Sequence, residues 1–343
     1  RSTLFPLLEG ISSISLLLLL ALGSGQLQQG SLSIGSLVAL ILYVERLVFP
    51  TALLGFTLNT FQTGQVSLER VEELLARRPL ISDPVEPEHL DLPVRGDLEA
   101  RNLHIRYDGS DSDTLDGLNF RIASGEMVAV VGPVGCGKTT LARALGRMVE
   151  VPGGQLFLDG HDLTCLRLDD LREQIALVPQ EGYLFTSSLA DNLRYGEPEA
   201  GLNRVEAAAQ QARLLADVRG FPDGMNTLVG ERGITLSGGQ RQRTALGRAL
   251  LLKAPVLVLD DALASVDNNT AAEILASVRR QTQRTIVMIS HQLSAAAACD
   301  RILVLDRGRL VQQGHHTDLI REQGLYRSLW EREQAAERLE SVA

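Results

Sequence analysis

The sequence predicts an α/β domain with a parallel sheet core, preceded by two transmembrane α-helices. Two long apolar segments lie near the N-terminus, short apolar runs alternate with helical patterns over residues 98–315, and a glycine-rich loop follows one of those runs. Runs that are apolar on both faces are typical of buried parallel strands. Segments of about 20 apolar residues are long enough to cross a bilayer.

The composition narrows the class of protein. The 343 residues carry a net charge of −9, which is the wrong sign for a protein that binds a nucleic-acid backbone. Hydrophobic residues at 45% and charged residues at 22% exclude a disordered chain. Cys136, Cys165 and Cys299 are too few and too scattered for a disulfide framework or a zinc site, which indicates a reducing compartment.

Residues 1–75 are predicted to be part of a transmembrane domain, with helices at about 4–23 and 36–56 and a cytoplasmic extension. The four charges within residues 1–68 cancel, so the whole net charge lies in the rest of the chain. Three arginines follow the second helix, and the positive-inside rule places the chain after residue 70 in the cytoplasm. These arginines are Arg70, Arg77 and Arg78.

Two alternatives for these segments stay open, a signal peptide and two buried helices of a soluble domain. A basic N-terminal region is missing, Glu9 occurs early, and a second apolar segment follows, all of which argue against a signal peptide. Since the chain begins at Arg1, we expect it to be a piece of a longer protein. Glu45 and Arg46 lie inside the second segment, where charges are costly. They either pair with helices outside this chain or line a transport pathway.

Residues 76–97 contain four prolines and are predicted to be a linker. The domain after it is predicted over 98–343, with strands at 127–131, 175–178, 256–259, 285–289 and 302–305. Its last segment, about 317–340, is predicted to be a pair of surface helices.

Polar residues follow four of these strands. They are Gly132, Gln180, Asp260 with Asp261, and Ser290 with His291. Parallel sheets bind ligands beyond the carboxyl ends of their strands, so these groups predict one site.

The segment GPVGCGKT fits the phosphate-loop pattern without a gap, between a strand and a helix. Its backbone N–H groups and the helix N-terminus would surround phosphates, Lys138 would reach the β- and γ-phosphates, and Thr139 would offer its hydroxyl to Mg²⁺. The alternative is a structural glycine-rich turn. The predicted ATP-binding residues of this segment are Gly132, Pro133, Val134, Gly135, Cys136, Gly137, Lys138, Thr139 and Thr140.

Two carboxylates end the strand LVLDD. An acidic residue there, opposite a phosphate loop, is typical of a magnesium ligand, and we assign this role to Asp260. Asp261 would hold the attacking water. The alternative is a solvated turn.

The segment LSGGQRQR precedes a helical pattern. Ser237 is a good N-cap, and Gly238 with Gly239 lets a phosphate approach the helix end. Between a phosphate loop and an LVLDD strand, this segment resembles the signature of the ABC ATPases. The resemblance covers nearly all of 98–325 and implies an ABC-type ATPase domain with an antiparallel β subdomain and a helical subdomain, which uses ATP and Mg²⁺.

The resemblance also implies roles for single residues. Tyr107 would stack on adenine, Gln180 would be the glutamine loop and a magnesium ligand, and His291 would be the switch histidine at the γ-phosphate. Asp261, His291 and Gln180 are thus the predicted catalytic residues. The signature, which would bind the ATP of a partner subunit, is Leu236, Ser237, Gly238, Gly239 and Gln240. The D-loop is Ala264, Ser265, Val266 and Asp267.

The stretch LVGERGITLSGGQRQR is similar to the exporter branch of that family. There, Glu231 would contact the coupling helices of the membrane part. Residues 1–75 resemble the last two of six helices of an exporter, so we expect a half-transporter in the plasma (inner) membrane, multi-pass, with a cytoplasmic ATPase domain. Its partners would be the lipid bilayer, a second half-transporter and an unidentified substrate, with no nucleic acid.

The family usually has glutamate where this chain has Asp261. Aspartate is shorter by one methylene, so the substitution resembles the degenerate site of heterodimeric exporters, and we expect a heterodimer. A homodimeric exporter, a regulatory subunit without turnover and a soluble ABC ATPase stay as alternatives. Cys136 lies at a helix N-terminus, a setting that lowers a thiol pKa, or is a small filler residue without a role.

Overall fold

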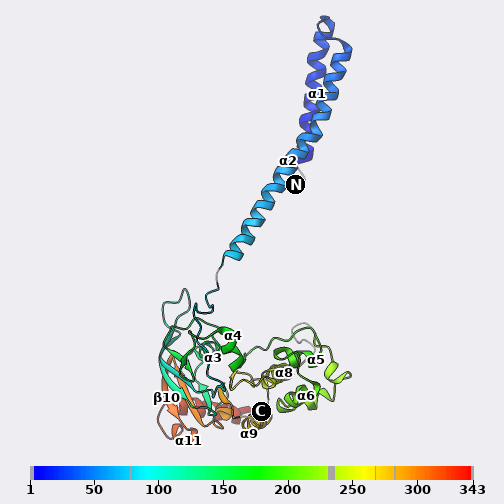
Figure 1. Cartoon of the computed structure of the whole chain (residues 1–343). Coiled ribbons are helices and arrows are strands. Elements are labelled where there is room, and N and C mark those ends of the chain that lie inside the picture. Colours follow the sequence, from blue (N-terminus) through cyan, green and yellow to red (C-terminus); the bar gives the residue numbers. More distant parts are fainter. Residues whose placement is uncertain (1–3, 78, 231–235, 267, 282, 341–343) are drawn as a thin grey trace. The chain divides into compact units, whose positions relative to one another are not determined.

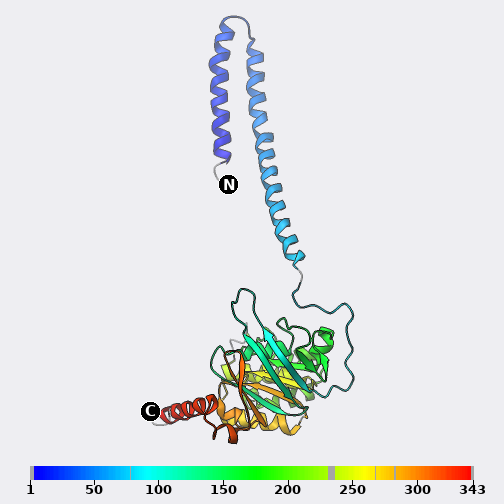
Figure 2. The same ribbon diagram turned by 90° about the vertical axis from the view of Figure 1, so that its left-hand side faces the viewer.

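The computed structural model describes residues 4–77, 79–230, 236–266, 268–281 and 283–340. The chain divides into two compact units, Arg1–Pro79 and Leu80–Ala343. Figure 1 and Figure 2 show the helical first unit and the mixed second unit. Each unit is described separately.

The first unit consists of helices α1 (Leu4–Gln28) and α2 (Ile34–Ala76), which lie side by side (Figure 2). α2 begins at Ser33, whose hydroxyl accepts a hydrogen bond from the Ser36 N–H at 3.1 Å. Such an N-cap satisfies one of the free donors of the first turn.

Apolar side chains of both helices face outward. Leu17 is 66% exposed and Phe49 is 73% exposed. Both helices are long and apolar enough to cross a membrane, judged by length and composition. Within this unit they are not the buried core helices of the soluble-domain alternative, and their surface fits association with a membrane.

Both helices are longer than predicted. The expected ends were about 23 and 56, whereas the helices continue to Gln28 and Ala76. The prediction followed the apolar stretch, but the polar residues after it include good helix formers such as Gln65, Glu69 and Glu72. The end of the apolar stretch therefore does not end the helix, because the polar residues that follow it also favour helix.

The second unit is built on a sheet of six strands in the order β10-β9-β3-β8-β7-β6. The five strands from β9 to β6 are parallel, and β10 is an antiparallel edge strand. Their bounds are β3 (Met127–Val131), β6 (Ile175–Val178), β7 (Val256–Asp260), β8 (Thr285–Ile289), β9 (Arg301–Asp306) and β10 (Arg309–Gly314). All residues of β3, β7 and β8 are buried, as expected for continuous apolar runs between two layers.

A second sheet of four antiparallel strands has the order β2-β1-β4-β5. Its strands are β1 (Leu98–Ile105), β2 (Leu115–Ile122), β4 (Leu156–Leu158) and β5 (His161–Asp162). Its apolar face packs with α3 and one face of the parallel sheet in a single core, which includes Leu103, Val130 and Leu141.

The helices of this unit fall into three groups. α3 (Lys138–Leu145) and α4 (Leu168–Gln174) follow the phosphate loop and β5. A separate hydrophobic core, with Leu193, Val205 and Leu214 among its members, joins a helical subdomain. That subdomain contains α5 (Leu189–Leu193), α6 (Leu202–Gln211), α7 (Leu215–Val218), α8 (Gly238–Leu251) and the short 3-10 helices η1 (Arg194–Gly196) and η2 (Gly224–Asn226). The rest are α9 (Asn268–Gln281), α10 (Leu293–Ala296), α11 (His316–Leu319) and α12 (Leu325–Glu340).

These parts confirm the predicted fold class, a parallel sheet core with an antiparallel β subdomain and a helical subdomain, preceded by two apolar helices. The predicted strands over 127–131, 175–178 and 285–289 have the observed bounds. The bounds of these strands could be predicted because each strand is an uninterrupted hydrophobic run.

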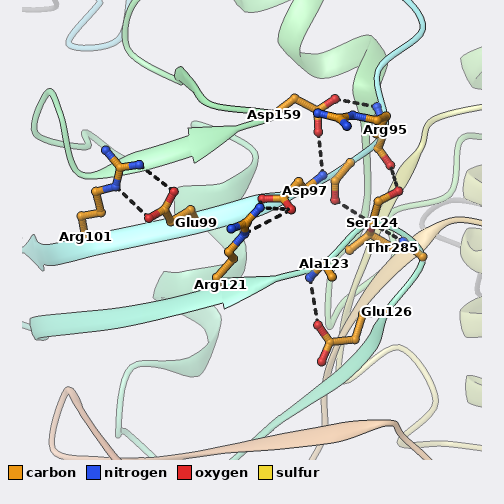
Figure 3. Close-up of polar contacts among 12 residues, drawn as sticks. Arg95, Asp97, Glu99, Arg101, Arg121, Ala123, Ser124, Glu126, Asp159 and Thr285 are labelled. Atoms are coloured by element: carbon orange, nitrogen blue, oxygen red, sulfur yellow. Dashed lines mark hydrogen bonds and ion pairs between the residues drawn. The ribbon is translucent and has the colours of Figure 1, made fainter.

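The end of the predicted linker is bound to both sheets. The carboxylate of Asp159 accepts the backbone N–H groups of Arg95 and Asp97, at 2.5 and 2.7 Å (Figure 3). From the other sheet, the Thr285 hydroxyl donates to the Gly96 carbonyl at 2.6 Å. Proline prevents a helix in this segment, but it does not prevent packing.

The prediction of a surface helix pair at the C-terminus is wrong for α12. Tyr326 is fully buried, and Leu329 and Trp330 pack against the main core. The Tyr326 hydroxyl lies 2.7 Å from His316 Nδ1 on α11. These residues recur at helical spacing, a stripe that the abundant charges of the segment obscured.

Candidate nucleotide-binding and catalytic site

The phosphate loop connects β3 to α3, and its conformation requires glycine. Gly137 has φ 103°, and a Cβ on it would lie 2.8 Å from the Thr114 carbonyl oxygen. A side chain at Gly132 would collide with the carbonyl of Leu305. Both glycines thus let the loop turn tightly under β9 and the start of β2. Val134, at the tip, is 88% exposed.

Lys138 is buried at the first position of α3 and points back into the loop. Its Nζ donates to the carbonyls of Gly132 and Pro133, at 2.8 and 2.9 Å. A buried ammonium group needs such partners. The loop therefore holds a positive charge at the N-terminus of α3, which suits a polyphosphate.

Thr139 and Asp260 meet across the sheet edge. The Thr139 hydroxyl donates to Asp260 Oδ1 at 3.2 Å. Burial, followed by the neighbouring charge of Asp261, raises the pKa of the Asp260 carboxyl. A buried carboxylate that lacks a full counter-charge fits a divalent cation, since Mg²⁺ prefers hydroxyl and carboxylate oxygens. Gln180 lines the same cavity of about 660 Å³ as these two residues.

Asp261 is held by His291. The backbone N–H of His291 donates to Asp261 Oδ1 at 3.1 Å, and its ring Nε2 lies 3.1 Å from Asp261 Oδ2. Asp261 has φ 48°, a left-handed conformation that aspartate tolerates better than most residues. Its side chain is 4% exposed, whereas that of His291 is 45% exposed. The pair therefore presents the imidazole, not the carboxylate, to solvent.

Tyr107 lies beside the start of α3. Its hydroxyl is 3.3 Å from Thr140 Oγ1, and the residue is 39% exposed. An aromatic ring next to a phosphate loop is well placed to stack on a base.

The signature residues form the N-terminus of α8. Ser237 is its N-cap, and a capping box joins the Ser237 hydroxyl to the Gln240 N–H and the Gln240 side chain to the Ser237 N–H. Gln240 also donates to Asp217 of the helical subdomain at 3.0 Å. Leu236 is buried. These contacts fix the start of α8 and link it to the helical subdomain.

Gly239 lies close to the D-loop, a contact that the sequence did not predict. A Cβ on it would lie 2.8 Å from the carbonyl oxygen of Ser265 in the D-loop. The missing side chain therefore admits the D-loop backbone, in addition to any phosphate.

Gln242 was missed by the sequence analysis. Its Oε1 accepts the Ser265 N–H at 2.7 Å, and its Nε2 donates to the Asp261 carbonyl at 3.4 Å. It thus joins the signature helix to the D-loop and to the end of β7. Its place next to the signature was the only signal, because nothing local shows contacts that span 19 and 23 positions.

The structure brings together the phosphate loop, Asp260, Asp261, His291 and Tyr107, with Gln180 at the rim. Ala264 and Val266 lie in the D-loop turn, where the Ala264 N–H donates to the Asp261 carbonyl at 3.1 Å. Glu231 and Asp267 lie outside the described residues.

The expectation of a lowered pKa for Cys136 is wrong. The thiol is buried, and this desolvation raises its pKa above the ordinary value. The helix N-terminus lies nearby, but the side chain faces the core that includes Leu141.

Residues 115–264 match the model of the ABC transporter family. A solved structure described as a bacterial Atm1-family ABC exporter with ATP bound is 35% identical, covers 95% of this chain and 57% of the other, and superimposes with a TM-score of 0.79. Residues 115–264 belong to the ABC transporter family. The second unit is therefore an ABC ATPase domain.

Three relatives show where the chain lies among ABC proteins. It is 38% identical to an ATM1-type heavy metal exporter of Novosphingobium aromaticivorans, over 91% of this chain and 51% of the relative. It is 40% identical to an ATP-dependent lipid A-core flippase of Aromatoleum aromaticum, over 88% and 50%. It is 36% identical to the multidrug resistance-like ATP-binding protein MdlA of Escherichia coli, over 92% and 54%. The chain thus spans about half the length of each relative.

Proposed function

We propose that this chain is the ATP-binding and ATP-hydrolysing part of a membrane exporter. The observation that carries the proposal is the convergence of Lys138, Asp260 and His291 at one edge of a parallel sheet, next to a helix N-terminus. The relatives with exporter and flippase names, which match 91% and 88% of this chain, support it.

Different residues of the site bind different parts of the nucleotide. Tyr107 stacks on adenine, the phosphate loop wraps the β- and γ-phosphates, and Lys138 exchanges its carbonyl partners for phosphate oxygens. Thr139, Asp260 and Gln180 hold Mg²⁺. The ion, when bound, neutralises the charge of the triphosphate. His291 faces the γ-phosphate, and Asp261 orients its ring.

A second ATPase domain completes the site. The N–H groups at the start of α8 and the Ser237 hydroxyl form an anion site without a phosphate of its own chain to serve. ATP is then held between the phosphate loop of one subunit and the signature of the other. Hydrolysis removes that bond between subunits, and the resulting opening moves the membrane helices.

The partner is a different half-transporter. Both carboxylate oxygens of Asp261 contact His291, so the short side chain is directed toward the histidine and would be a poor base for the attacking water. A heterodimer whose second subunit carries glutamate at this position resolves the deficit, with the intact signature of this chain serving the active site. A homodimer is the second candidate. The similarity to a relative named as a flippase supports testing both assemblies.

The membrane assignment rests on the first unit. α1 and α2 span the inner membrane as part of a multi-pass domain, with the ATPase domain in the cytoplasm after Arg70 and Arg77.

The test uses the full-length transporter in lipid nanodiscs. Lys138→Ala is expected to abolish ATP binding and hydrolysis, while Arg101→Ala, which removes a surface ion pair with Glu99, leaves both unchanged. Wild-type protein that neither binds nor hydrolyses ATP would contradict the proposal. Vanadate trapping of nucleotide separates a hydrolysing subunit from one that only binds.

A further inference from the structure

Residues 290–294 follow β8 and include His291, and each of them donates its backbone N–H to a hydrogen bond. His291 donates to Asp261 Oδ1, and Gln292 donates to the Ser290 hydroxyl at 3.0 Å. The next two N–H groups, of Leu293 and Ser294, begin α10. Helix α10 has four residues, and its N-cap, Gln292, makes no side-chain hydrogen bond to cap it. Such a helix start needs an acceptor from elsewhere.

Glu333 supplies that acceptor from α12. Its carboxylate accepts the Leu293 N–H at 2.8 and 3.0 Å and the Ser294 N–H at 3.3 Å. A carboxylate at a helix N-terminus forms charge-assisted hydrogen bonds and meets the positive end of the helix dipole. The contact joins segments 40 positions apart in the sequence.

The helix that carries Glu333 is anchored to the core. Tyr326, Leu329 and Trp330 lie on the same face as Glu333, at the spacing of successive helical turns, and Tyr326 is fully buried. Gln312 of β10 accepts the Tyr326 N–H at 3.0 Å. α12 therefore holds the carboxylate at a fixed place relative to the sheet.

A cavity of about 680 Å³ connects the two ends of this arrangement. Its wall includes the phosphate-loop residues Pro133 and Val134, together with His291, Leu293 and Glu333. A shift of the segment that carries His291 would thus change the shape of the cavity next to the phosphate loop.

We propose that Glu333 is a positioning residue for His291: it fixes the first turn of α10 and so sets the place of the imidazole at the γ-phosphate. This inference rests on the proposed function. Asp261 holds the segment from the sheet side, and Glu333 holds it from the C-terminal helix. Misplacement of a catalytic group by about 1 Å costs on the order of 100-fold in rate, so loss of one of the two holds is expected to lower kcat by about tenfold.

The experiment compares three variants of the full-length protein assembled with itself, so that each bound ATP faces His291 of this chain. Glu333→Ala removes the acceptor, Glu333→Gln keeps one acceptor oxygen, and Glu331→Ala removes an exposed ion pair with Arg327 on the same helix. We expect Glu333→Ala to lower kcat about tenfold with KM for ATP within about twofold of wild type, Glu333→Gln to restore most of the rate, and Glu331→Ala to match wild type.

Hydrogen exchange of residues 290–297 gives a readout that needs no turnover. Glu333→Ala is expected to accelerate exchange there about tenfold, with Glu331→Ala unchanged. Unchanged exchange, or an unchanged kcat in a transporter that hydrolyses ATP, would overturn the positioning role. If wild-type protein does not hydrolyse ATP, the proposed function fails, while the exchange rates still decide whether Glu333 holds the segment.

Discussion

His291 meets Asp261 at two points, with its backbone N–H 3.1 Å from Asp261 Oδ1 and its ring Nε2 3.1 Å from Asp261 Oδ2. One carboxylate thus fixes both the main chain and the ring of the histidine. Both oxygens of this short side chain point toward the histidine. The geometry gives a physical reason why aspartate at this place would orient the switch histidine yet serve poorly as a base.

Asp261→Glu is expected to raise ATP hydrolysis by about tenfold or more, because the longer carboxylate reaches past the histidine toward the attacking water. The measurement is steady-state phosphate release by the full-length protein, assembled with itself and with its partner. The gain should be largest when both subunits come from this chain, since both sites then carry the change.

Asp261→Asn is the matched control, because it keeps the length and removes the charge. It should not raise the rate. Brisk hydrolysis by wild-type homodimers, at the rate of the glutamate variant, would show that aspartate suffices and would contradict the heterodimer proposal.

The cysteines are expected to react with alkylating reagents in a fixed order. Burial raises the pKa of Cys136, and burial raises the pKa of Cys299 to about 12, so at pH 7.5 both thiols stay protonated and unreactive. Cys165 is half-buried and should be alkylated first. Because only the thiolate reacts, the rate at Cys136 should rise as the pH rises above the ordinary thiol value.

Mass spectrometry after timed treatment with iodoacetamide gives the three rates, and the same reaction in denaturant provides the reference in which all three become equal. Alkylation of Cys136 as fast as Cys165 in the folded protein would show an exposed thiolate in the phosphate loop, contrary to its observed burial.

The meeting of the site residues at one sheet edge was easier to predict than the contacts that hold them in place. Lys138, Asp260 and His291 follow apolar strands, and a parallel sheet brings the ends of such strands to one edge whatever the loops between them do. The strand β8 had its predicted bounds because every residue in it is buried. Local pattern and global topology agree at these positions.

The contacts that hold the site residues in place were not predicted, because they join segments that lie far apart in the sequence. Gln242 reaches Ser265, and Glu333 reaches Leu293, through side chains whose partners no local periodicity reveals. For Cys136 the nearby helix N-terminus suggested a lowered pKa, whereas desolvation in the core raises the pKa. Packing in three dimensions outweighed the nearest sequence feature in each case.

The close approach of Gly239 to the D-loop predicts the effect of adding one methyl group. Gly239→Ala would put its Cβ 2.8 Å from the Ser265 carbonyl oxygen, so the D-loop or α8 must move. We expect a loss of about 1–3 kcal/mol in the free energy of unfolding and a fall in ATP hydrolysis, since Gln242 ties the same loop to Asp261. Gly153→Ala is the control, because its Cβ would make only contacts of 3.5 Å or more. Thermal unfolding and phosphate release measure both variants, and equal behaviour of the two would show that the D-loop backbone yields without consequence.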